Sequence, residues 1–219
     1  MSSALIQLLR AQANPANVAG MARYGIRPAK AYGVATPVMR SIAKDLSRDT
    51  ELASALWSTG VLEARIVATM IADPLVIPEV EVERWVRDFD CWSVCDSACI
   101  GLLWKTPFAW RKMREWSRRK PEYERRAAFA LLAGLAVHDK KATDPRFRVA
   151  LRLIARAATD DRNYVKKAVN WALRQIGKRN AALREDAIAM AKSLIDTESR
   201  SARWIGHDAL RELRRKKSL

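Results

Sequence analysis

The residues whose types and spacing could do chemistry are Trp92, Asp96, Arg126 and Trp171. Trp92 and Asp96 stand four residues apart, so on a helix they share one face, and Trp171 follows Lys167 by the same spacing. An indole ring on a polar face can pack against a sugar, a base or a cationic group. The alternative for a tryptophan is a role in the core or in hairpin packing, which we expect for Trp57, Trp85, Trp104, Trp116 and Trp204.

Asp96 and Arg126 belong to a column at the starts of five predicted helices, which reads Arg65, Asp96, Arg126, Lys167 and Arg203. The steps between them, 31, 30, 41 and 36 residues, are typical of stacked helical hairpins in a HEAT-like solenoid. If the hairpins stack in order, the column lines one concave, basic face. Asp96 is the single acid among four cations, which indicates a different role for it.

Cations at helix starts predict phosphate contacts. A helix amino terminus presents unpaired N–H groups and a partial positive charge, so a basic residue there is unfavourable unless an anion binds. The alternative is that these cations pair with acids of neighbouring repeats. Arg125 competes with Arg126, because a shift of one residue turns a helix by about 100°. The predicted DNA-binding residues are Arg65, Arg125, Lys166, Lys167 and Arg203, with Arg23, Arg27 and Lys30 around the non-helical stretch 25–36.

Between helix breakers nearly every segment has a 3.6-residue apolar period, so the fold class is all-α. Short connections favour antiparallel hairpins, and no linker divides residues 1–219, so we expect a single domain. Helices are predicted at 3–13, 15–24, 37–46, 51–57, 61–72, 78–88, 91–104, 107–118, 121–137, 144–158, 161–178, 181–197 and 201–216, followed by a cationic end that reaches Lys217.

The charge balance points to a polyanionic partner. Forty Lys and Arg against 24 Asp and Glu give a formal charge of +16, and nucleic acid is the usual partner of such a surface. The longest apolar run is too short to cross a bilayer and the amino terminus carries no secretory pattern. We therefore expect a cytoplasmic protein with no membrane association.

The three cysteines favour a structural role. Cys91, Cys95 and Cys99 follow one helix stripe, and neither a histidine nor a further cysteine stands at metal-ligand spacing. They are predicted to be core thiols. We expect neither a metal nor a cofactor, since no Gly-rich phosphate loop or cofactor motif is present.

Several segments resemble the AlkD family of alkylpurine DNA glycosylases with HEAT-like repeats. The resemblance is carried by residues 89–97, 125–128 and 164–174, with 21–24 and 33–37 near the start, so it spans nearly the whole chain. It departs at Cys91 and Ser93, where relatives often have an aromatic residue and an acid.

The resemblance implies a monomeric enzyme, associated with the nucleoid, that acts on double-stranded DNA. It would hydrolyse the N-glycosidic bond of N3- or N7-alkylated purines without flipping the base. Asp96 would stabilise the oxocarbenium charge and place a water, Trp92 and Trp171 would cradle the deoxyribose, and Arg126 would hold a phosphate. The alternative is a non-catalytic DNA- or RNA-binding module, in which Asp96 is a helix cap or an ion-pair partner. A third alternative, a solenoid that serves as a protein scaffold, fits the repeats but does not explain the formal charge of +16.

Overall fold

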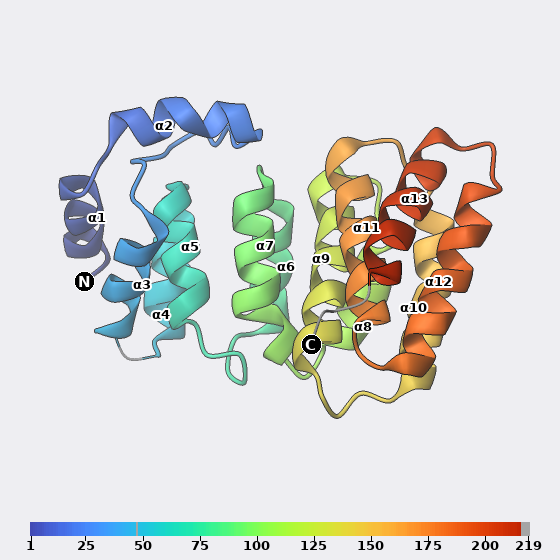
Figure 1. The fold of residues 1–219 in the computed structure, drawn as a ribbon. Helices are drawn as coiled ribbons and strands as arrows, with labels where there is room; N and C mark the ends of the chain where they lie inside the picture. The colour runs from blue at the N-terminus through green and yellow to red at the C-terminus, as the bar shows by residue number, and fades with distance from the viewer. Residues whose placement is uncertain (47, 216–219) are drawn as a thin grey trace. The chain divides into compact units, whose positions relative to one another are not determined.

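The computed structural model describes residues 1–46 and 48–215, and these contain helices but no strand (Figure 1). The all-α prediction is confirmed, and each of the thirteen α-helices in the described residues falls on a predicted segment. Two predicted helices end early, in short 3₁₀ turns: the first turn leads to Gly25 at φ 71° and the second follows Gly101. None of the described helices is both long and apolar enough to span a membrane. Lys216 and Lys217 of the predicted cationic end lie outside the described residues.

The chain forms two compact units, Met1–Phe108 and Ala109–Leu219. The single domain predicted for 1–219 stays a prediction, as does the concave basic face. Unit 1 contains α1 (Ser2–Ala11), α2 (Pro15–Met21), η1 (Ala22–Tyr24), α3 (Thr36–Lys44), α4 (Thr50–Ser58), α5 (Leu62–Ile71), α6 (Glu79–Arg87), α7 (Trp92–Gly101) and η2 (Leu103–Lys105). Unit 2 contains α8 (Ala109–Trp116), α9 (Glu122–His138), α10 (Asp144–Ala157), α11 (Asn163–Gly177), α12 (Ala181–Ile195) and α13 (Arg200–Arg214).

The core of unit 1 is built around two stacked indole rings. Trp57 of α4 and Trp85 of α6 are fully buried, with parallel rings whose centroids lie 4.2 Å apart. Phe89 meets Trp57 edge-on. Helix α5 contacts α3, α4 and α7, so it connects this aromatic core to the helix that carries Asp96.

A buried acid fixes the loop that precedes α3. Glu63, in the first turn of α5, is fully buried, and its carboxylate accepts hydrogen bonds from three consecutive backbone N–H groups. These belong to Tyr32, Gly33 and Val34, at 3.0, 2.7 and 3.3 Å. Gly33 has φ 78°, and a Cβ there would lie 2.2 Å from the carbonyl oxygen of Asn14, so only glycine fits. The basic loop is therefore held against both α2 and α5.

Unit 2 is built around α11. This helix contacts α9, α12 and α13, while α8 packs on α9, and α10 packs on α11 and α12 (Figure 1). Helix α9 is buried on nearly all sides from Arg126 to Ala136, which explains its long apolar run. The first turns of α11 and α13, where the sequence places predicted phosphate ligands, thus belong to neighbouring helices.

Candidate functional site

The cysteine stripe of α7 determines which face of the helix carries Trp92 and Asp96. Cys91, Cys95 and Cys99 are free thiols and all are buried, as predicted. Burial raises the pKa of the Cys91 thiol to about 11, so it is protonated at neutral pH. Because the stripe faces the core, Trp92 and Asp96 lie one turn apart on the half-buried flank beside it.

Trp92 is fastened to the segment that carries Arg23. Its indole Nε1 donates a hydrogen bond of 2.8 Å to the carbonyl oxygen of Tyr24, although the two residues are 68 positions apart. Arg23 and Tyr24 are exposed, and the ring of Tyr24 is a large exposed aromatic that the sequence analysis did not single out. The tertiary structure therefore joins Trp92 and Arg23 at the start of α7.

The other cations of the basic loop remain available for a ligand. Arg27 and Lys30 are exposed, and neither they nor Arg23 form an ion pair with any residue that the structure describes. Lys30 also accepts a backbone hydrogen bond from Leu62 through its carbonyl oxygen, which anchors the loop but leaves the ammonium group outside. Their DNA contacts stay predictions that this geometry favours.

Arg65 is bonded within unit 1. Its side chain is 13% exposed, Nη1 donates to the carbonyl oxygen of Asp88 at 3.1 Å, and the carboxylate of Asp90 lies 3.5 Å away. The guanidinium also lies 5.3 Å from the ring centroid of Trp57. This matches the alternative expectation, pairing with a neighbouring repeat, and argues against a phosphate contact by Arg65.

Arg125 and Arg126 likewise have partners within unit 2. Arg126 is buried and its Nη1 donates to the carbonyl oxygen of Tyr164 at 2.7 Å, which connects α9 to the first turn of α11. Arg125 is ion-paired with Asp160 at 3.1 Å and is a quarter exposed. Burial alone would raise the pKa of the Asp160 carboxyl, but hydrogen bonds from Arg162 and the charges of Arg162 and Arg125 hold this pKa below its ordinary value. Arg125 is therefore the more accessible of the two, and the choice between them stays open.

Helix α11 presents one exposed and two half-buried residues of the predicted site. Lys167 is exposed and forms no ion pair with another described residue, whereas Lys166 and Trp171 are half-buried. The ammonium group of Lys166 lies 5.1 Å from the ring centroid of Trp204. Trp171 and Arg126 belong to unit 2 and Asp96 and Trp92 to unit 1, so the four-residue constellation stays a prediction.

Helix α13 carries an exposed tryptophan. Trp57, Trp85 and Trp116 are fully buried and Trp104 is half-buried, but Trp204 is 41% exposed, so a place in the core is wrong for it. Arg203, beside it, donates to the carbonyl oxygens of Thr197 and Glu198 at 3.1 and 2.7 Å. Ala202, Trp204 and Ile205 are all apolar, so the sequence alone does not tell which of them faces solvent. In the structure Ala202 and Ile205 are buried and Trp204 is the exposed one.

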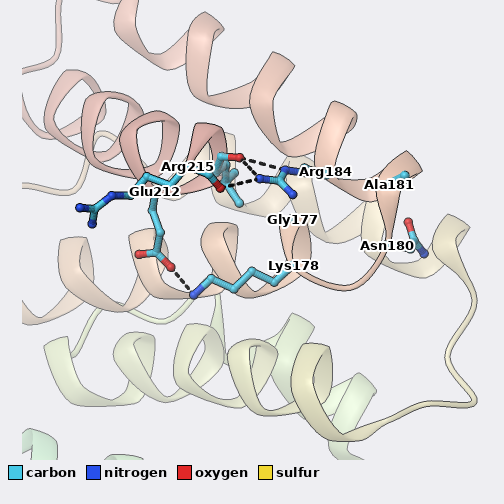
Figure 2. A pocket seen from close by; sticks show the side chains of 8 residues that line it. Gly177, Lys178, Asn180, Ala181, Arg184, Glu212 and Arg215 are labelled. Atoms are coloured by element: carbon cyan, nitrogen blue, oxygen red, sulfur yellow. Dashed lines mark hydrogen bonds and ion pairs between the residues drawn. The ribbon is translucent and has the colours of Figure 1, made fainter. Parts of the chain in front are cut away.

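A hollow of about 510 Å³ near the end of α13 contains cations that are already bonded (Figure 2). Arg184 donates to the backbone carbonyls of Leu213 and Arg215, and Lys178 is ion-paired with Glu212. Burial alone would raise the pKa of the Glu212 carboxyl, but hydrogen bonds from Lys178 and Arg174 hold it below its ordinary value. We assign this hollow a structural role.

The fold and these cationic helix starts define a HEAT-like repeat protein. A solved structure with the same fold has a TM-score of 0.79 and 21% identity over 95% of this chain and 94% of that chain. It is described as a new family of proteins related to the HEAT-like repeat DNA glycosylases, with affinity for branched DNA structures. Residues 5–216 match the family described as DNA alkylation repair enzyme. This chain belongs to the DNA alkylation repair enzyme family.

Two designed proteins show weaker likeness. An engineered protein has a TM-score of 0.40 and 13% identity over 75% of this chain and 81% of that chain. A designed armadillo repeat protein has a TM-score of 0.37 and 13% identity over 80% of this chain and 91% of that chain. No curated protein sequence matches the chain.

Proposed function

We propose that this chain is a monofunctional DNA glycosylase that hydrolyses the N-glycosidic bond of positively charged N3- or N7-alkylated purines, such as 3-methyladenine and 7-methylguanine. The observation that carries the proposal is the position of Asp96, one turn after Trp92 on the less buried face of α7. The family of DNA alkylation repair enzymes, to which the chain belongs, supports it.

The proposed chemistry needs one well-placed carboxylate more than a strong acid. Alkylation at N3 or N7 gives the purine a positive charge, so the base leaves with the electrons of the glycosidic bond and needs no protonation. Positive charge then develops on the deoxyribose as an oxocarbenium ion. A fixed carboxylate near this charge lowers the barrier, because it is oriented before the reaction begins. Asp96 would stabilise the cation and orient the water that adds to C1′, and the proton of this water would pass to the Asp96 carboxylate or to solvent.

The remaining residues would hold the DNA. Trp92 and Trp171 would cradle the deoxyribose of the lesion, Arg126 or Arg125 would bind a phosphate, and the base would stay outside any deep pocket. The exposed cations Arg23, Arg27, Lys30 and Lys167 would bind phosphates of the duplex. A monomer bound along nucleoid DNA would be sufficient for this activity.

The test is release of 7-methylguanine from methylated duplex DNA by the wild type and by Asp96→Asn. We expect the variant to lose about 100-fold or more of the rate, as when one transition-state stabilising group is removed, and to keep its affinity for DNA. Asp45→Asn, which removes the same charge from an exposed position of unit 1, is the matched control and should release base normally. Equal rates in Asp96→Asn and the wild type would refute the role of Asp96.

A second candidate is a non-catalytic binder of branched DNA, which the affinity described for the solved relative favours. In that case the wild type releases no alkylated base and binds a four-way junction more tightly than a linear duplex of equal length. Replacing Asp96 would then change stability alone. The wild-type release assay therefore separates the two candidates before any variant is made.

A further inference from the structure

An open hollow of about 590 Å³ lies in unit 2 where α11 and α13 begin. The loop that precedes α11 contributes Asp161, and the first turn of α11 contributes Lys166. The start of α13 contributes Ser199, Arg200 and Trp204. Polar groups make up most of this wall, and the indole of Trp204 is its one aromatic surface.

Trp204 is unusual as an exposed indole on an otherwise regular amphipathic helix. Its neighbours Ala202 and Ile205 are completely buried, so the core of α13 does not need a further apolar side chain at this position. With 41% of its surface exposed, Trp204 leaves a large aromatic area in water. The ammonium group of Lys166 lies 5.1 Å from the ring centroid, within cation–π distance. An exposed indole is a surface on which a nucleobase can stack.

The charges around this ring favour an anion. Lys166 and Arg200 outnumber the single carboxylate of Asp161, and Arg200 forms no ion pair within the described part of the chain. Neither α11 nor α13 has an acid in its first turn, so nothing from these helices offsets the partial positive charge of their amino termini. Ser199 caps only the N–H of Ala202 among the first N–H groups of α13. A phosphate placed here would meet two cations and two helix starts.

The hollow of Figure 2 shows what a structural cluster looks like by contrast. There Arg184 donates to backbone carbonyls and Lys178 is ion-paired with Glu212, so two of the three cations that line the hollow are already bonded. At the start of α13 the cations and the indole have no comparable set of partners. We propose that this hollow binds one unpaired nucleotide of DNA, with its base stacked on Trp204 and its phosphate held by Lys166 and Arg200. This site needs no base release, so it is independent of Asp96.

The test compares two fluorescent probes of equal length and phosphate number, a short oligothymidylate and its fully abasic counterpart. We expect the wild type to bind the oligothymidylate about 5- to 100-fold more tightly in anisotropy titrations, the usual range for one stacked base. Trp204→Ala should bind both probes equally, and Trp204→Phe should recover most of the difference. Lys166→Ala should weaken binding of both probes.

Several results would overturn the proposal. Equal affinity of the wild type for both probes, or full discrimination by Trp204→Ala, would exclude stacking on Trp204. Tighter binding of the matching oligouridylate would assign the hollow to RNA.

Thermal unfolding of Trp204→Ala at the wild-type temperature would show that its lost discrimination between the probes is not caused by unfolding. Asp96→Asn should retain the discrimination, so the outcome does not depend on the glycosylase proposal.

Discussion

In each unit a charged side chain holds a loop through hydrogen bonds to its backbone, and the two side chains have opposite charges. In unit 1 the carboxylate of Glu63 accepts from three successive N–H groups of the loop before α3. In unit 2 the guanidinium of Arg179 donates to three carbonyl oxygens at the end of α9 and beyond, at 2.6, 3.0 and 3.2 Å. When an acid binds the N–H groups of a loop, no cation is used, so nearby cations can still bind a ligand. When an arginine binds carbonyl oxygens, its own guanidinium can no longer bind a ligand.

This difference changes how the formal charge of +16 should be interpreted. In unit 2, Arg126, Arg162, Arg184 and Arg203 also donate to backbone carbonyl oxygens. Together with Arg179, five arginines of unit 2 therefore stabilise loops and helix ends through backbone carbonyls. The exposed cations of the unit 1 loop are fewer but have no such partners, so we expect each of them to contribute more to DNA affinity.

The largest effect should come from Glu63→Ala. Two buried N–H groups and one half-buried N–H group would lose their acceptor, and we expect a loss of about 4 kcal/mol in the free energy of unfolding. Glu63→Gln keeps one acceptor oxygen and should lose about half as much. Urea denaturation gives the free energy, and amide hydrogen exchange of residues 32–34 locates the loss. Unchanged exchange in this loop would contradict the fastening role of Glu63.

A smaller effect is expected for Arg179→Met, which retains an apolar stem over Phe147 but removes the donors. Charged hydrogen bonds to partly buried carbonyls are involved, so the free energy of unfolding should fall by about 2 kcal/mol. Arg118→Met, at an exposed position of the same unit, is the control and should stay within about 0.5 kcal/mol of the wild type. If Arg179→Met and Arg118→Met had the same free energy of unfolding in urea, a role of Arg179 in holding its loop would be contradicted.

The smallest effect concerns binding. Lys167→Ala removes an exposed cation and should lower the slope of log affinity against log salt by about 0.9, the value for one phosphate contact on duplex DNA. Arg148→Ala removes a cation that is paired with Asp186 at 2.8 Å, and its slope should equal that of the wild type. Equal slopes for all three proteins would exclude Lys167 as a phosphate ligand.

Much of the fold could be predicted because it depends on local spacing. The 3.6-residue period gave all thirteen α-helices of the described residues, and the i, i+4, i+8 cysteines identified the inward face of α7. Since the side chains on a helix project at fixed angles, the same spacing placed Trp92 and Asp96 together on a flank beside that inward face. Neither inference required knowledge of any distant residue.

The partners of the charged residues depended on tertiary structure. Arg65 meets Asp88 across 23 positions and Arg126 meets Tyr164 across 38, and no local pattern predicts such pairs. The exposure of Trp204 likewise depends on how α13 lies against α11 and α12. The sequence by itself determined the helices and their inward faces, because helical periodicity is a property of neighbouring residues. Only the tertiary structure decided which cations and rings are left for a ligand, because a guanidinium bonds to whichever carbonyl or carboxylate the packing brings within reach.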